Sequence, residues 1–241
     1  ALADLPIDLA QEIRHYSLML TLGIISSLFY VGAWRAPTRG NRTGHVLASI
    51  ALLYTHYLGA FILGVQGIHW LLTARPPRRL LTGLTQFAAI GIGFLPWLPV
   101  MVAQNRVRWD HPLYYQNALP NSPETFRAVR TAVLGQHYAL LAGLALLGLV
   151  YLTYRRGEQG RERARISVHP VWPALFLTVW IVLVVMVTVV VNARREFLTV
   201  RNFVIIVPPL LLLAAHGLSN LERTARLFLT ASGGPFLNRD P

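Results

Sequence analysis

Long apolar runs separated by short polar segments dominate the pattern of this 241-residue chain. Several runs exceed about 18 residues, the length that lets a helix cross the hydrocarbon core of a bilayer. One of them is rich in β-branched residues, but in lipid only helices and closed barrels satisfy the backbone, so we interpret it as a helix too. The pattern predicts an all-α, polytopic transmembrane helical bundle with about five full spans, at 15–34, 80–103, 131–154, 171–191 and 203–218.

A further apolar run, at 46–72, differs from the others because the polar and titratable segment Tyr54–Tyr57 lies near its midpoint. Such residues are costly in lipid and usually face a protein interior or a wet cavity. If the run is a helical hairpin, the loops divide into a side with 14 arginines and a side with 8; a single tilted helix gives 10 and 12. Because cytoplasmic loops are rich in arginine, we expect a short or re-entrant hairpin that turns near Gly59, with an extracytoplasmic tip.

Prolines and polar segments divide the remaining chain. Pro96 and Pro99 predict a kink near the end of the 80–103 span, and Pro208–Pro209 predict a break in the last span. We expect a single transmembrane helical domain over 1–220 and a polar C-terminal tail over 221–241. The chain opens with Ala1 and shows no basic region of a signal peptide, so we expect it to be part of a longer protein.

Composition narrows the class of protein. Charged residues make up 13% of the chain, about half the share of a soluble domain. The net charge of +12 comes entirely from arginines in short loops, where membrane topology and anionic lipid headgroups explain it better than nucleic acid does. Membrane lipid is therefore an expected partner and nucleic acid is not. The absence of cysteine excludes disulfides, thiolate chemistry and cysteine-ligated metals.

Four short motifs follow one another along the chain and together resemble a known family. They are Gln11–Tyr16 (QEIRHY), Tyr54–Tyr57 (YTHY), Phe94–Pro99 (FLPWLP) followed by Ala103–Gln104, and Arg201–Phe203 followed by Pro208–Pro209. Their order and spacing resemble bacterial glycosyltransferases of the GT-C superfamily, in the branch similar to dolichyl-phosphate-mannose protein mannosyltransferases. The resemblance covers roughly residues 5–220.

The resemblance implies an activity but no catalytic residue. Family members are membrane enzymes that transfer a sugar from a polyprenyl-phosphate donor to an extracytoplasmic acceptor, so it implies the bacterial inner (plasma) membrane. The acidic residue that acts as their catalytic base lies in a loop ahead of the first motif, which here would precede Ala1, and neither Asp4 nor Asp8 matches it. The alternative is a non-catalytic integral membrane subunit of a larger complex. A transporter ranks third, since only the proline-broken spans favour it.

Seven residues are the candidates for binding the donor and acceptor. They are Glu12, Arg14, Tyr54, His56, Tyr57, Trp109 and Arg201. An arginine fork such as Arg201 suits a phosphate because it donates paired hydrogen bonds, although it also suits a headgroup-level anchor. Trp109 would stack on a sugar, or else its segment is amphipathic and rests on the membrane surface. The two tyrosines would equally suit an interfacial belt.

His56 is the titratable candidate in the middle of the apolar hairpin. It would hydrogen-bond a phosphate oxygen or satisfy a buried polar contact. With Glu12 it would also provide two ligands for a divalent cation, but no third ligand follows from the sequence, so we predict no metal site or other cofactor. The remaining histidines, His45, His69 and His216 among them, are scattered, and their spacing assigns none of them to the site.

Overall fold

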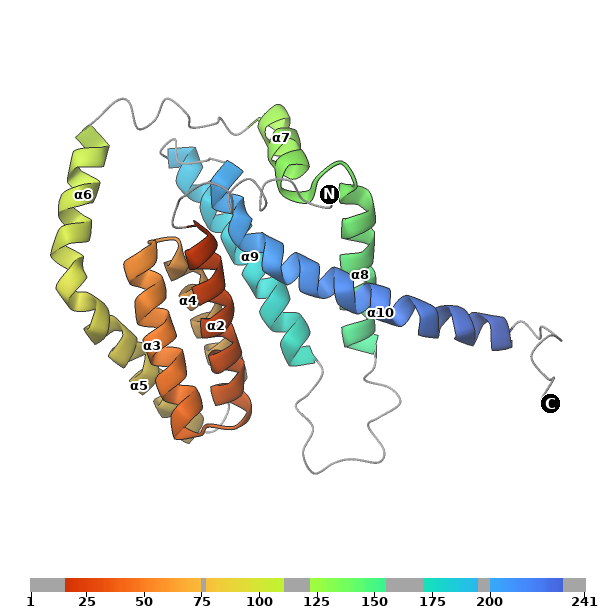
Figure 1. Cartoon of the computed structure of the whole chain (residues 1–241), viewed down its shortest axis with the longest axis horizontal. Helices are drawn as coiled ribbons and strands as arrows, with labels where there is room; N and C mark the ends of the chain where they lie inside the picture. The colour runs from red at the N-terminus through yellow and green to blue at the C-terminus, as the bar shows by residue number, and fades with distance from the viewer. Residues whose placement is uncertain (1–15, 75–76, 111–121, 155–170, 195–199, 232–241) are drawn as a thin grey trace.

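The computed structural model of the chain describes residues 16–74, 77–110, 122–154, 171–194 and 200–231. Within these ranges the chain is helical apart from short turns, which confirms the predicted all-α class. The helices are α2 (Tyr16–Arg35), α3 (Arg39–Thr55), α4 (Gly59–Thr73), α5 (Pro77–Phe94), η1 (Leu95–Trp97), α6 (Leu98–Asp110), α7 (Pro123–Leu134), α8 (Tyr138–Tyr154), α9 (Val171–Arg194), η4 (Val200–Ile206) and α10 (Val207–Ala231), as Figure 1 shows.

Among the described residues, four helical segments are long and apolar enough to cross a membrane by length and composition. They are Tyr16–Arg35, Pro77–Gln104, Trp172–Asn192 and Phe203–Leu221. Gly59–Thr73 and Tyr138–Leu152 are shorter apolar helices. The predicted span at 131–154 is divided, because Gly135 takes a φ of 71° that ends α7 and α8 begins three residues later. The long apolar helices indicate an integral membrane protein.

The predicted hairpin at 46–72 is formed by α3 and α4, which lie side by side and turn at residues 56–58 (Figure 1). It is longer than expected, since α3 already begins at Arg39, inside the predicted loop. Thr38 caps that helix by accepting a hydrogen bond from the Asn41 amide at 3.2 Å. At the turn, a Cβ on Gly59 would lie 2.6 Å from Leu52 Cγ, so glycine lets the two arms meet.

Prolines shape two other helices. Pro96 lies in η1, between α5 and α6, and confirms the predicted kink. Pro208 and Pro209 lie in the first turn of α10 and begin that helix instead of breaking it, because a first-turn proline loses no helical hydrogen bond. The apolar part of α10 ends near Leu221, and the helix continues to Ala231 into the segment expected to be a polar tail, so the first part of that segment is helical.

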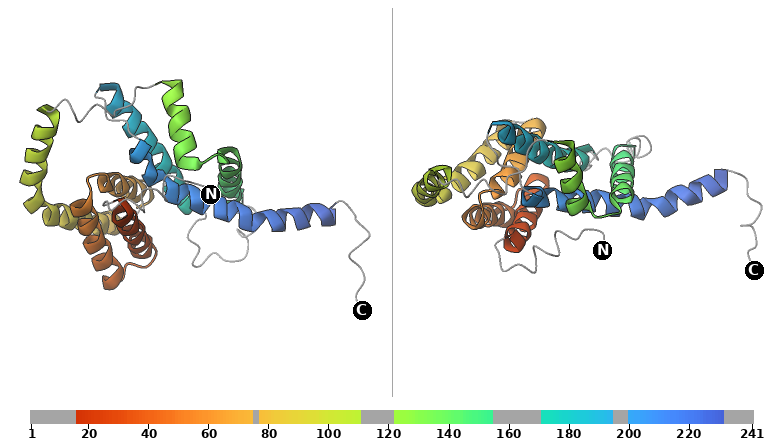
Figure 2. Two further views of the ribbon diagram at one scale, coloured as in Figure 1. Left: turned by 45° about the horizontal axis from the view of Figure 1, so that its top comes forward. Right: turned by 90° about the horizontal axis from the view of Figure 1, so that it is seen from above.

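The helices pack as two groups around α9. α2, α3, α4 and α5 form one group, and α8 with α10 forms the other (Figures 1 and 2). α8 and α10 cross closely, since a Cβ on Gly148 would lie 2.0 Å from the Leu213 carbonyl oxygen and one on Gly217 would lie 2.0 Å from that of Leu144. We call the end of the bundle at residues 56–58 the tip end. The opposite end, where α2 and α4 finish and α9 begins, is the base end (Figure 1).

Candidate functional site at the hairpin tip

Tyr54 joins the last turn of α3 to the proline-kinked segment. Its hydroxyl donates to the carbonyl oxygen of Gly93 at 3.2 Å. Its ring meets Phe94 edge-on, with centroids 5.9 Å apart, and lies 5.5 Å from Trp97. Because Tyr54 is 40% exposed, this aromatic contact forms a surface of the tip rather than part of the core.

Tyr57 links the turn to α6. Its hydroxyl donates a hydrogen bond to Oε1 of Gln104. The side chain is half-buried, and the bond spans 47 residues of sequence. The YTHY segment and the segment from Phe94 to Gln104 therefore contact one another at two separate points.

His56 ends α3 and supports the turn with both backbone and side chain. Its amide donates to the Leu52 carbonyl at 3.0 Å, and its Nδ1 accepts from the Leu58 amide at 3.0 Å. An accepting Nδ1 places the proton of the neutral imidazole on Nε2, so that atom is a hydrogen-bond donor. The ring is half-buried and lies 5.3 Å from Tyr16, at the start of α2.

Three of the four sequence motifs thus meet at the tip end. We call this group the tip cluster: Tyr16, Tyr54, His56, Tyr57, Trp97 and Gln104. It combines an imidazole, an amide, phenol groups and aromatic faces beside apolar helices. Such a set suits a ligand that combines a phosphate or sugar with a lipid chain.

The structure does not place the other candidates. Glu12 and Arg14 lie outside the described residues. Trp109 belongs to α6 and Arg201 to η4, but their side chains also lie outside the description. The proposed pairing of Glu12 with His56 is therefore untested. Among the described residues, no group of three side chains could hold a metal ion.

Sequence reasoning missed a second polar group, buried between the helices. We call it the buried layer: Ser26 on α2, His45 and Ser49 on α3, Gln66 on α4 and Gln86 on α5. The ring nitrogens of His45 lie 2.9 Å from Gln66 Oε1 and 3.1 Å from Gln86 Oε1. Gln66 Nε2 donates to Ser26 Oγ at 3.1 Å, and that oxygen lies 2.9 Å from Ser49 Oγ. The buried layer thus ties four helices together.

His69 lies next to this layer and has a partner of its own. Its Nδ1 is 2.6 Å from the hydroxyl of Tyr30, whose ring is also 5.5 Å from that of His45. The sequence contained a signal that His45 and His69 lie at the same depth of the hairpin. His45 precedes His56 by as many residues as His69 follows Leu58, which places the two at one depth of an antiparallel hairpin.

Comparisons with protein-family models, curated proteins and solved structures gave no match to this chain.

Proposed function

We propose that this chain is the membrane domain, or part of it, of a glycosyltransferase that takes a sugar from a polyprenyl-phosphate donor and passes it to an extracytoplasmic acceptor. One observation carries the proposal. The motifs that resemble the GT-C family are far apart in sequence, yet Tyr16 lies against His56, Tyr54 against Trp97 and Tyr57 against Gln104. Convergence of this kind is expected when motifs build one site and is not required when they only anchor separate helices.

The chemistry of each side chain gives it a role in this proposal. The imidazole of His56 would contact a phosphate oxygen, and Gln104 with Tyr57 would contact the sugar or phosphate. Leu95 and Leu98, which are 56% and 39% exposed beside Trp97, would lie along the isoprenoid chain. Arg14, Arg201 and Glu12 would complete the phosphate and acceptor contacts, and Trp109 would stack on the sugar.

The location follows from the same proposal. The hairpin turns at residues 56–58, so the arginine-bearing loops on either side of it share the base end. With these loops in the cytoplasm, the tip cluster would face outward across a bacterial inner membrane. A sugar donor on a polyprenyl phosphate would reach it from the outer leaflet.

One observation favours the accessory-subunit alternative. Among the side chains that the structure describes, the only carboxylate is Glu124, in the first turn of α7. Transfer to a hydroxyl needs a base, and no described residue of the tip cluster provides a carboxylate for that role. An accessory subunit would keep the fold and copurify with other membrane subunits in a fixed ratio.

The test is a transfer assay on the full-length protein in proteoliposomes with a radiolabelled polyprenyl-phosphate sugar. We expect His56→Ala to lower the rate on the order of 100- to 1,000-fold through loss of one contact to developing charge. Arg201→Ala should have a similar effect. His137→Ala, an exposed histidine between α7 and α8, is the matched control and should leave the rate unchanged. Full activity of both His56→Ala and Arg201→Ala would contradict the proposed site, and an inactive wild type that copurifies stoichiometrically with other subunits would favour the alternative.

A further inference from the structure

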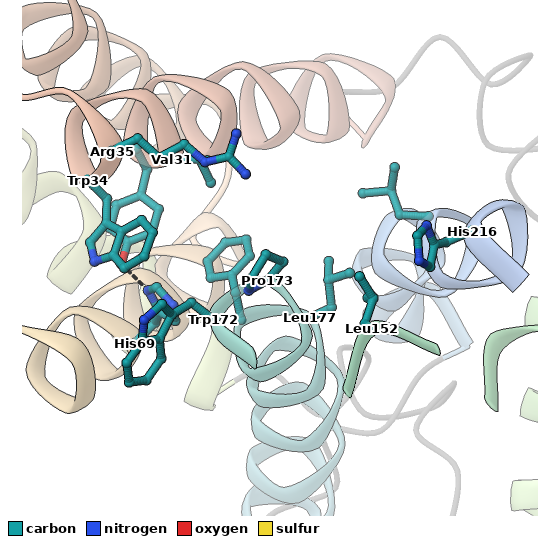
Figure 3. A pocket seen from close by; sticks show the side chains of 12 residues that line it. Val31, Trp34, Arg35, His69, Leu152, Trp172, Pro173, Leu177 and His216 are labelled. Carbon is teal, nitrogen blue, oxygen red and sulfur yellow. Dashed lines mark hydrogen bonds between the residues drawn. The ribbon is translucent and has the colours of Figure 1, made fainter. Parts of the chain in front are cut away.

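A cavity of about 280 Å³ lies at the base end of the bundle, opposite the tip cluster. The last turns of α2 and α4, the first turns of α9, and α8 with α10 surround it (Figure 3). Tyr30, Trp34 and His69 line one side, Leu152 and Leu212 the other, and Phe176 belongs to the lining from α9. It therefore lies between the two helix groups of the fold.

The walls of this cavity are mostly apolar, although His69 and His216 belong to the lining, and hydrogen bonds hold two of its aromatic side chains. The Tyr30 hydroxyl is held by His69, and the Trp34 indole donates to Thr73 Oγ1 at 3.1 Å. These bonds engage the polar atoms of both aromatic side chains, so their rings are left to form the wall. The ring of Tyr30 also stacks on Phe176, with centroids 5.5 Å apart. A hydrocarbon chain suits such walls better than a polar ligand.

A positively charged arginine side chain lies at the mouth of the cavity. Arg35 is the last residue of α2, is exposed, and extends over the space between the two walls (Figure 3). It makes no hydrogen bond or ion pair with another residue that the structure describes. Further arginines lie at the same end, at the starts of α3 and α5: Arg39, Arg42, Arg78 and Arg79. The apolar cavity thus opens beside a basic surface at the end of the spans.

We propose that this cavity binds an anionic phospholipid, with its phosphate on Arg35 and one acyl chain between the walls. Two features of the structure match the two parts of that ligand: a guanidinium donates paired hydrogen bonds to a phosphate, and the fixed aromatic wall accepts an alkyl chain. The arginines at the same end of the bundle favour an anionic over a zwitterionic headgroup. This proposal does not depend on the function proposed for the tip cluster.

Native mass spectrometry of the detergent-solubilised full-length protein tests the headgroup contact. Phosphatidylglycerol and phosphatidylcholine with identical acyl chains are titrated separately. We expect phosphatidylglycerol to bind about fivefold more tightly, the effect of roughly one arginine near a lipid surface. Arg35→Gln should abolish this preference, whereas Arg39→Gln should retain most of it. Equal binding of the two lipids by the wild type, or an equal loss in both variants, would overturn the proposal.

A second pair of variants tests the acyl chain. Leu177→Trp fills the cavity from α9 and should weaken both lipids at least severalfold. Val182→Trp changes an exposed position of the same helix and serves as the control. Unchanged lipid binding by Leu177→Trp would show that the acyl chain does not lie in this cavity. Displacement of phosphatidylglycerol by inorganic phosphate at the same concentration would show the same. If Leu177→Trp fails to fold, the comparison of Arg35→Gln with Arg39→Gln still tests whether the lipid binds at this cavity.

Discussion

The hairpin of α3 and α4 carries histidines in two settings, and the contrast separates structural from functional polarity. At mid-height His45 is fully buried, and both of its ring nitrogens lie within 3.1 Å of glutamine side chains from neighbouring helices. At the tip His56 is half-buried, and its Nδ1 bonds a backbone amide two residues away. The first arrangement joins helices to one another, whereas the second orients one ring at an accessible end.

This difference shows that a polar residue in an apolar helix is not by itself a sign of a ligand. Buried polar groups in a membrane protein need partners, and a network that satisfies its members fixes how the helices pack. The buried layer meets that description. The tip cluster has more exposed aromatic surface and combines the residues of three motifs. Stability should therefore depend on the buried layer and activity on the tip cluster.

The largest expected effect on stability follows from His45→Leu. The leucine fills similar space but removes the ring that joins two buried glutamine side chains, at a cost of about 2–3 kcal/mol in the free energy of unfolding. Unfolding in a mixed-detergent titration measures it. A loss below about 0.5 kcal/mol would mean that the buried layer does not hold the four helices together.

Tyr30→Phe should have an intermediate effect. It removes the hydroxyl that lies 2.6 Å from His69 Nδ1 and leaves that buried nitrogen without a partner, which costs about 1 kcal/mol. The stacking on Phe176 is retained, so the variant isolates the hydrogen bond. The same unfolding titration checks it, and a variant as stable as the wild type would show that this bond adds nothing to packing.

His56→Ala should change stability least among the hairpin histidines. It removes one hydrogen bond from the Leu58 amide at a half-buried position, so we expect a loss below about 1 kcal/mol. Sugar transfer should nevertheless fall far more than in His137→Ala. A stability loss equal to that of His45→Leu would show that the tip cluster and the buried layer do not differ in their contribution to stability.

Tyr57→Phe is the variant in which we expect the smallest effect, because it removes a single hydroxyl group. It removes the hydroxyl that donates to Gln104 and leaves the ring in place. We expect the free energy of unfolding to fall by about 0.5–1 kcal/mol. A spin-label distance between α3 and α6 should broaden if this bond orients α6, and an unchanged distance distribution would show that the bond has no such role.

Local features of the fold, such as turns and kinks, could be predicted from the sequence, whereas most contacts between helices could not. The arginine balance and the polar Tyr54–Tyr57 segment predicted the hairpin, and Pro96 predicted the kink. Gly135 was missed as a helix end because it stands within an apolar run, and Pro208–Pro209 were interpreted as a break although first-turn prolines begin helices. These errors arose where one residue type is compatible with two local structures.

The candidate site was only partly accessible to the same reasoning. Tyr54, His56 and Tyr57 were named as candidates because they form one motif, whereas Tyr16, Trp97 and Gln104 were not, since they contact that motif from other helices. His45 and His69 were left unassigned because their partners, Gln66 with Gln86 and Tyr30, come from other helices. Only the assumption of an antiparallel hairpin, combined with counting from its turn, would have placed the two histidines at one depth.

Photo-crosslinking tests most directly the proposal that a polyprenyl phosphate binds at the tip. The full-length protein in proteoliposomes would be illuminated with a polyprenyl phosphate that carries a photoreactive group, and the labelled peptides identified by mass spectrometry. We predict labelling of the segments around Tyr54–Tyr57 and Phe94–Gln104, reduced severalfold in His56→Ala and unchanged in His137→Ala. Labelling confined to the base end, around Trp34 and Trp172, or equal in both variants, would contradict it.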